Sequence, residues 1–150
     1  MEYQHYLYLK STDCLSFYPS NSPGSFYSKL PQNFYLRGMW ECALLQIQYV
    51  NSYFGNTVSP RCFYVCTDIC AESVLSESKK PILRRVNNVF QSENVNQTIE
   101  ADIKNVIYVP IKKEFIDVIH LYIIDDSGTP LVFSTGPLYV TLHLRQVRGF

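Results

Sequence analysis

Apolar and polar residues alternate with a period of two through most of the chain, which is the pattern of a β-strand with one buried face. In the first strand expected, one face is formed by Tyr3, His5, Leu7 and Leu9. The last strand expected, Leu138–Arg145, alternates between inward Leu138, Val140, Leu142 and Leu144 and outward Tyr139, Thr141, His143 and Arg145. Both ends of the chain are therefore predicted to be strands with an apolar inner face.

Short apolar runs predict further strands between these two. They are Phe26–Leu30, Phe34–Tyr49 with a break at Gly38, Cys62–Cys70, Ile82–Val86, Val106–Ile111, Ile116–Asp125 and Leu131–Phe133. The segment Trp40–Tyr49 is long and apolar enough for a helix, but its β-rich flanks and its later polar alternation favour a strand.

Turn-forming and polar stretches separate the expected strands. Such residues are dense in Tyr18–Ser25 and in Asp125–Pro130, and the second stretch predicts a hairpin turn. Three longer polar stretches are predicted to be loops: Asn51–Pro60, Glu72–Lys80 and Asn87–Asp102. No internal repeat, linker or convincing long helix interrupts the pattern, so residues 1–150 are expected to form a single all-β domain. Eight to ten short strands predict two packed sheets, as a sandwich or a jelly roll.

Composition narrows the classes of function. The 150 residues are 47% hydrophobic and 17% charged, so the chain has enough apolar content to fold. Thirteen basic and thirteen acidic residues give a net charge of zero, whereas a dedicated nucleic-acid-binding protein normally carries a basic excess. A neutral chain lacks the repulsion that keeps copies apart, and its 12 Tyr and 9 Phe suit half-buried interfaces. We therefore expect no specific nucleic-acid partner, and a chain suited to packing against copies of itself.

The sequence predicts neither secretion nor a membrane span. Its start, Met1–His5, has no basic segment followed by an apolar one, as a secretory signal would. Its apolar stretches are far shorter than the roughly 20 residues that cross a bilayer as a helix. The protein is thus expected to be made in the cytoplasm or nucleus, with its five cysteines reduced.

Three cysteines recur at every fourth position, as Cys62, Cys66 and Cys70. In one continuous strand, all three thiols would share a face and span about 13 Å, too far for three ligands of one metal ion. Zinc sites also use a second, distant pair of ligands, and the chain has no such pair. The prediction is that these cysteines are small buried side chains and that no residue binds a metal.

The search for catalytic chemistry gives no candidate. The chain has no nucleophile elbow, no zinc-protease motif and no glycine-rich phosphate or dinucleotide loop. His5, His120 and His143 lie singly in expected strands, and the acidic pair Asp125-Asp126 lies in a turn. We therefore predict no catalytic and no cofactor-binding residue.

Basic residues form two modest groups. They are Lys79, Lys80, Arg84 and Arg85 in mid-chain, and Arg145 with Arg148 near the end. The favoured interpretation is a solvated surface, and the alternative is electrostatic contact with an acidic neighbour or with packaged nucleic acid.

The order and spacing of several blocks resemble a known pattern. The first block is Leu30-Pro31 followed by Leu36-Arg37-Gly38-Met39-Trp40-Glu41-Cys42-Ala43-Leu44 and by Ile47-Gln48-Tyr49. Further blocks are Tyr64–Ile69, Pro81–Val86, and Ile119–Asp126 with Gly128, Gly136 and Val140–Arg145. Together they are similar to the small jelly-roll proteins of Polinton (Maverick) elements and related adintoviruses. Val50 and Tyr53 depart from that pattern, where Pro and Trp are usual.

This resemblance implies a single jelly-roll β-sandwich of about eight antiparallel strands, acting as a minor capsid (penton) protein. Such a protein forms pentamers at the icosahedral vertices of the virion capsid, beside a major capsid protein with a double jelly roll. The chain is too short for a double jelly roll, since each sandwich domain takes roughly 100–200 residues. The residues that carry the resemblance have structural roles: Leu30, Pro31, Gly38, Trp40, Glu41, Asp125, Gly128 and Gly136.

Other functions fit the composition as well. A jelly-roll binding module could use exposed Tyr side chains to recognise a carbohydrate or a receptor. An accessory scaffold or cement protein and, less favoured, an enzyme are further alternatives. A ring-shaped assembly would indicate the capsid role, whereas saturable sugar binding by a small species would indicate the binding module.

Overall fold

The computed structural model describes residues 3–50, 62–75, 77–87, 97–131, 133 and 136–147. These residues contain strands and turns and no helix, which confirms the all-β prediction for them. The strands are β1 (Gln4–Lys10), β2 (Ser25–Tyr35), β3 (Trp40–Val50), β4 (Cys62–Thr67), β5 (Ser73–Leu75), β6 (Ser78–Lys80), β7 (Ile82–Asn87), β8 (Thr98–Asp102), β9 (Val109–Pro110), β10 (Phe115–Ile124) and β11 (Tyr139–Gln146).

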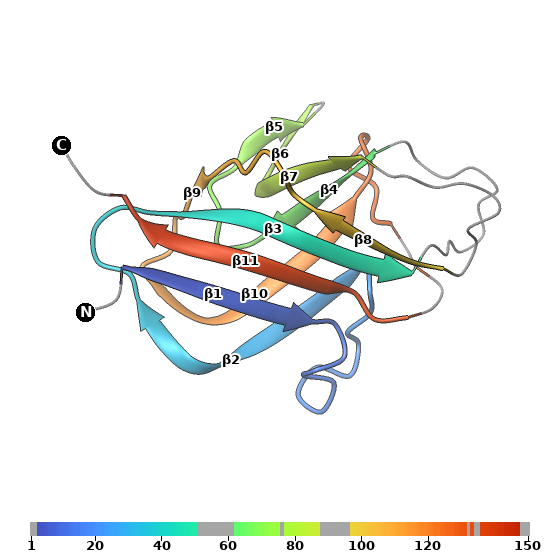
Figure 1. Ribbon diagram of the computed structural model, residues 1–150, viewed down its shortest axis with the longest axis horizontal. Coiled ribbons are helices and arrows are strands. Elements are labelled where there is room, and N and C mark those ends of the chain that lie inside the picture. The colour runs from blue at the N-terminus through green and yellow to red at the C-terminus, as the bar shows by residue number, and fades with distance from the viewer. Residues whose placement is uncertain are drawn as a thin grey trace.

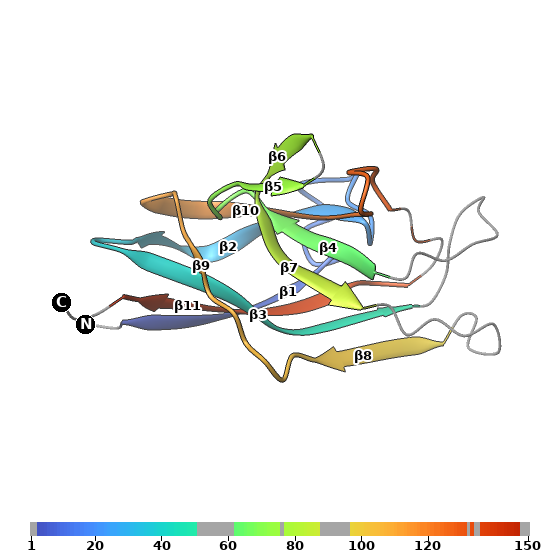
Figure 2. The same cartoon turned by 90° about the horizontal axis from the view of Figure 1, so that it is seen from above.

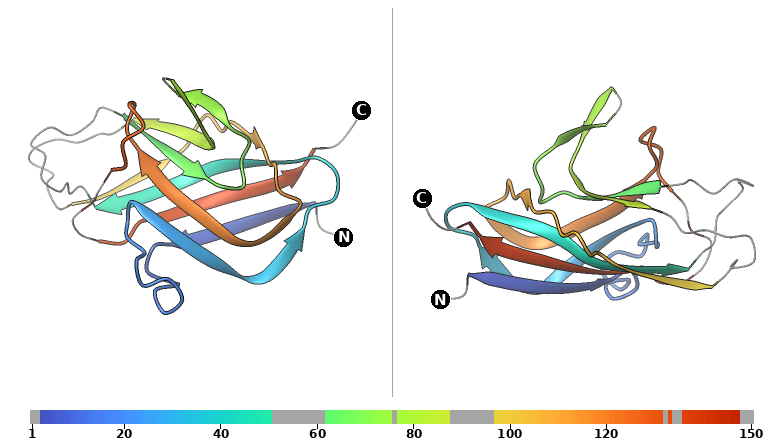
Figure 3. Two further views of the ribbon diagram at one scale, coloured as in Figure 1. Left: turned by 180° about the vertical axis from the view of Figure 1, so that it is seen from behind. Right: turned by 45° about the horizontal axis from the view of Figure 1, so that its top comes forward.

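Two antiparallel sheets form a β-sandwich (Figure 1). The first sheet has the order β1-β11-β3-β8, with β9 also paired to β3, and we call it sheet A. The second, sheet B, has the order β2-β10-β4-β7. Figure 2 shows the two layers edge-on, and Figure 3 shows sheet B from behind, with the small β5–β6 hairpin above it.

Strand pairing is nested from the two ends of the chain toward its middle. β1 pairs with β11, β2 with β10, β3 with β8, and β4 with β7, all antiparallel. The two sheets are completed by β11 beside β3 and β10 beside β4. Strands from the first half of the chain therefore obtain their partners from the second half.

The core lies between the two sheets and is formed by the alternate residues that the pattern predicted. In β11 and just before it, Leu138, Val140, Leu142 and Leu144 are at most 2% exposed, as expected. In β1, Leu7 and Leu9 are buried and His5 is half-buried. Aromatic rings fill the middle, where Tyr49 meets Phe63 edge-on with centroids 5.4 Å apart. Removal of such apolar area from water is the main stabilising contribution.

The predicted break at Gly38 is confirmed, and so is a strand rather than a helix after Trp40. The predicted end of a strand before Pro31 is wrong, because β2 continues through Pro31 to Tyr35. Proline has no backbone N–H to donate to a neighbouring strand, and β2 accommodates it because it is the edge strand of sheet B, with a neighbouring strand on one side only.

Two stretches predicted to be loops contain strands. Residues 72–80 include the β5–β6 hairpin, and the end of the 87–102 stretch is β8, paired with β3. In β8, Ile99 and Ala101 are half-buried while their neighbours are exposed, so its apolar pattern was too weak to recognise. The predicted 51–60 loop and residues 88–96 lie outside the described residues.

Two predicted strands are shorter in the structure. Val106–Ile111 reduces to β9, which is Val109–Pro110. Of the expected return strand 131–133, Leu131 and Phe133 are not in a strand and residue 132 lies outside the described residues, while the Leu131 N–H donates to the Ile123 carbonyl at 3.0 Å. Among the described residues, no helix has the length and apolar character to cross a membrane.

Candidate functional site

The residues that carried the resemblance do not form one site: five lie on β2, in the turn after it and at the start of β3, and three lie between β10 and β11. Near the start of β3, Gly38 has a φ of 81°, and Trp40 donates its Nε1–H to the Arg37 carbonyl at 3.0 Å. Leu30 is buried on β2, and Pro31 is exposed beside it. These four positions and Glu41 shape the turn between β2 and β3 and the strands around it.

The other residues of this set shape two loops. Asp125 caps a turn, since its Oδ1 accepts the N–H groups of Ser127 and Thr129, both at 2.9 Å. Partial burial raises the pKa of the Asp125 carboxyl, but hydrogen bonds from Ser127, Thr129 and Gly128 outweigh it, and the net shift is downward. Gly128 and Gly136 have φ of 86° and 79°, in the left-handed region that glycine occupies without strain.

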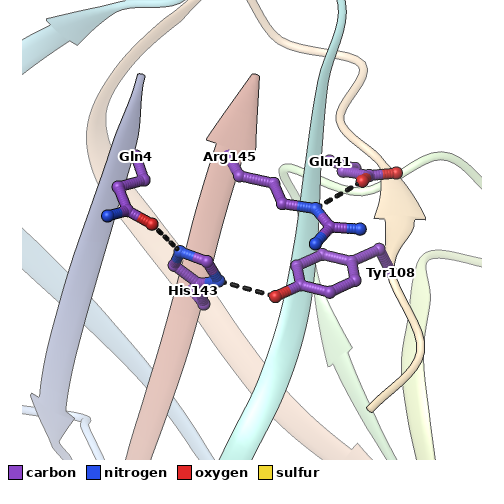
Figure 4. Close-up of polar contacts among 5 residues, drawn as sticks. All are labelled: Gln4, Glu41, Tyr108, His143 and Arg145. Carbon is purple, nitrogen blue, oxygen red and sulfur yellow. Dashed lines mark hydrogen bonds and ion pairs between the residues drawn. The ribbon is translucent and has the colours of Figure 1, made fainter. Parts of the chain in front are cut away.

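A polar network on the outer face of sheet A joins three strands and the segment before β9 (Figure 4). Arg145 Nε donates to Glu41 Oε1 at 2.6 Å, and its guanidinium lies 3.4 Å from the centre of the Tyr108 ring. The Tyr108 hydroxyl is 2.6 Å from His143 Nδ1, and Gln4 Oε1 is 2.9 Å from His143 Nε2. In a neutral ring these contacts place the proton on Nε2, which donates to Gln4, while Tyr108 donates to Nδ1.

His143 is buried, although its strand position predicted an outward side chain. It does point to the outer face, but the Tyr6 ring stacks on it at 4.4 Å, and only 7% of it is exposed. Burial lowers the pKa of His143, and the nearby charge of Arg145 lowers it further. The network holds the edge strand β1 and the segment before β9 against the sheet.

A second histidine cluster lies on the outer face of sheet B. His120 Nε2 is 2.9 Å from Ser25 Oγ, and the Tyr27 ring stacks on the imidazole at 4.1 Å. Asp68 accepts the His120 backbone N–H at 3.0 Å and pairs with Lys113 at 2.9 Å. Burial lowers the pKa of His120, and the charge of Asp68 opposes this. Asp68 therefore fixes the backbone at His120 by a hydrogen bond. The Ser25 hydroxyl and the His120 imidazole form a second hydrogen bond at the surface.

We expect the free energy of unfolding to decrease as the pH falls through about 6.5, the ordinary pKa of histidine. Because His120 and His143 have lowered pKa values in the folded protein, the unfolded chain binds protons first and is favoured at acid pH. The two neutral histidines contribute fully to the free energy of unfolding above that pH, and the contribution decreases as the pH falls from there toward their lowered pKa values. Denaturant titrations between about pH 7.5 and pH 5 measure the slope. A combined His120→Gln and His143→Gln variant should show a shallower slope, and an unchanged slope would contradict this assignment.

The three regularly spaced cysteines do not share one face, so that prediction is wrong. β4 ends at Thr67, and the chain turns there because the Cys70 N–H donates to the Thr67 carbonyl at 3.2 Å. Cys70 consequently enters the core beside Cys42, whose pKa is raised by its hydrogen bond with the Cys70 thiol and by burial. Cys66 is also buried, and burial raises its pKa to about 12. Within the described ranges, no three His, Cys, Asp or Glu side chains are grouped to hold a metal ion.

The hydrogen-bond partners of His143 in the sheet A network come from distant parts of the chain and cannot be read from its local sequence. The alternation of β11 placed His143 and Arg145 on one face, which is the only sequence signal for this site. Tyr108 and Gln4 lie 35 and 139 residues from His143 along the chain, and no local pattern connects them. No family model matches this chain, and no curated protein matches it either.

Proposed function

We propose that the sandwich is a jelly roll. Nested pairing supports this: when a long antiparallel hairpin is wound into a barrel-like sandwich, the first strand pairs with the last, the second with the second-last, and so on inward. β1 with β11, β2 with β10, β3 with β8 and β4 with β7 follow that rule. These eight strands, four in each sheet with the short β9 as a fifth in sheet A, match the eight strands of a jelly roll.

The function we propose is that of a structural capsid protein: a minor capsid, or penton, subunit that forms pentamers at icosahedral vertices. The nested pairing is the observation that carries this proposal, together with the resemblance to Polinton and adintovirus proteins. The major capsid protein would be its partner, and the virion capsid its location after synthesis in the host cytoplasm or nucleus. Zero net charge and exposed tyrosines such as Tyr8, at 74%, also support association between copies.

The β5–β6 hairpin is the part of the described structure best placed to reach a neighbouring capsid protein. It stands away from the two sheets (Figure 2), and Val74, the middle residue of β5, is 72% exposed. An exposed aliphatic side chain on a projecting hairpin favours burial against another chain. In the proposed particle, that chain is the major capsid protein.

Light scattering of the purified chain tests the proposal. We expect a species with five times the mass of the 17.4 kDa chain. A salt-independent monomer at every concentration, which also fails to join particles of the major capsid protein, would contradict a penton role.

A second candidate, a carbohydrate-binding module, is favoured by one feature of sheet A. Its outer face carries two rows of side chains that run across the strands. One row is Tyr8, Thr141, Gln46 and Asp102, and the other is Lys10, Tyr139, Gln48 and Glu100. A shallow hollow of about 280 Å³ lies over this band, with aromatic rings, amides and a carboxylate around it. Saturable binding by a monomer on a glycan array, lost in Gln48→Ala and retained in Tyr35→Ala, would support this function over the first.

A further inference from the structure

Large exposed hydrophobic side chains gather on one edge of the sandwich. Among the described residues there are twelve, and seven of them lie between residues 3 and 35: Tyr3, Tyr6, Tyr8, Leu15, Phe17, Tyr27 and Tyr35. This segment includes β1 and β2, which are the first strands of sheets A and B. Both are edge strands, although the side chains of Asn21 and Cys14 occupy the outward backbone groups of Tyr27 and Lys29 on β2. We call this side the tyrosine edge.

A groove follows the tyrosine edge between the two sheets. It consists of two adjoining hollows, of about 900 and 280 Å³, which share Tyr6, Leu7 and Pro31. β1 forms one wall and β2 the other, so the groove extends along the length of β1. Exposed apolar side chains that gather along a groove are a feature of interaction sites.

The opposite edge of the sandwich has complementary chemistry. There, β7 and β8 are the last strands of their sheets (Figure 1), and we call this side the arginine edge. A hollow of about 400 Å³ lies between β7 and the segment before β9, with Arg84, Arg85 and Ile107 in its lining. Arg85 and Ile107 are exposed, and Arg84 is held by a 2.6 Å bond to the Asn105 carbonyl.

Two kinds of contact can form between these edges. Guanidinium groups stack on aromatic rings, and Tyr and Arg are the residue types that contribute most to protein interfaces. In addition, Lys10 and Lys29 on the tyrosine edge match the exposed carboxylates of Glu100 and Asp102 on the arginine edge. The only described partner of both carboxylates is the neutral amide of Gln46, at 2.8 Å.

We propose that the tyrosine edge of one copy docks against the arginine edge of the next. This inference rests on the proposed pentamer and specifies its interface. The two surfaces are different and lie on opposite sides of the molecule, so the contact is head-to-tail and each copy binds two neighbours. Repetition of one such contact closes into a ring when the rotation between copies divides the circle evenly.

Variants on each edge test the interface in the full chain. Tyr6→Ser with Tyr8→Ser removes the exposed rings of one edge, and Arg85→Ser with Ile107→Ser removes the contacts of the other. We expect each double variant to weaken association at least about tenfold and to scatter as a monomer. Met39→Ser is the matched control, since this side chain is 72% exposed but belongs to neither edge, and it should leave the mass unchanged.

Mixing the two double variants separates this interface from other ways of associating. Each variant retains one intact edge, so a 1:1 mixture should form a dimer with twice the chain mass and no larger species. Thermal unfolding of each variant checks that it is folded, and Tyr8→Ser alone replaces the double variant if that one is not. A pentameric wild type whose edge variants stay pentameric, or whose mixture stays monomeric, would overturn the interface and leave the proposed function standing. A wild type that stays monomeric and also fails to join particles of the major capsid protein would overturn both.

Discussion

We expect Trp40→Ala to lower the free energy of unfolding by about 3–5 kcal/mol, the range for truncation of a large buried aromatic side chain. Trp40 is the first residue of β3 and is 7% exposed. Its indole is nearly parallel to the His5 ring, with centroids 5.7 Å apart, and its Nε1–H donates to the Arg37 carbonyl. Alanine would leave a cavity between β1 and β3 and remove the bond that closes the Gly38 turn.

Trp40→Phe separates these two contributions. Phenylalanine retains most of the packing but cannot donate to the Arg37 carbonyl. It should therefore lower the free energy of unfolding by only about 1–2 kcal/mol, the sum of one lost hydrogen bond and a small loss of buried volume. Urea unfolding with a fixed m-value measures both variants. Equal costs in the two variants would mean that the hydrogen bond, and not the packing of the indole, dominates at this position.

Gly136→Ala is expected to destabilise the protein by about 2–5 kcal/mol, more than the same change at Gly128. Both glycines have positive φ, which costs another residue about 1–2 kcal/mol. At Gly136, however, an added Cβ would overlap the side chain of Val50, at the end of β3. At Gly128, the nearest atom to such a Cβ is Lys80 Cε at 3.9 Å, an ordinary contact. The additional loss of stability in Gly136→Ala, compared with Gly128→Ala, therefore measures the energetic cost of the overlap, about 1–3 kcal/mol.

Val50→Ala should restore part of the stability that Gly136→Ala removes. Combined with Gly136→Ala, it removes Val50 Cγ2, the atom closest to the new Cβ, while Val50 Cβ remains 2.8 Å away, so the double variant should cost less than the sum of the single ones. Thermal unfolding of the four proteins completes the cycle. Strict additivity would show that the Gly136 backbone conformation alone, and not its contact with Val50, accounts for the effect.

Local periodicity was a good guide to the inner faces of the strands. The alternation of β11 correctly identified Leu138, Val140, Leu142 and Leu144 as core residues, because side-chain direction in a strand depends only on position. The same rule placed His143 outward but could not show that it is covered. Its burial depends on Tyr6 and Tyr108, which the fold brings from other parts of the chain.

Errors occurred where a strand depends on its partner. The prediction of one strand through Cys62–Cys70 assumed a continuous pattern, but the chain turns after Thr67, where Asp68 binds the backbone of His120 on β10. β8 was predicted to be a loop because two half-buried residues are a weak signal, and it is a strand because β3 offers a free edge. Pairing across long sequence separations cannot be read from local composition.

The sequence by itself determined that this is a β protein and which side chains form most of its core, since both follow from the spacing of apolar residues along the chain. It also located the turns at Gly38 and Gly128, where the local conformation requires glycine. Only the tertiary structure decided which strands pair, which thiols meet, and which tyrosines lie together on one free edge. These features depend on contacts between distant segments, and their geometry exists only once the two sheets have packed.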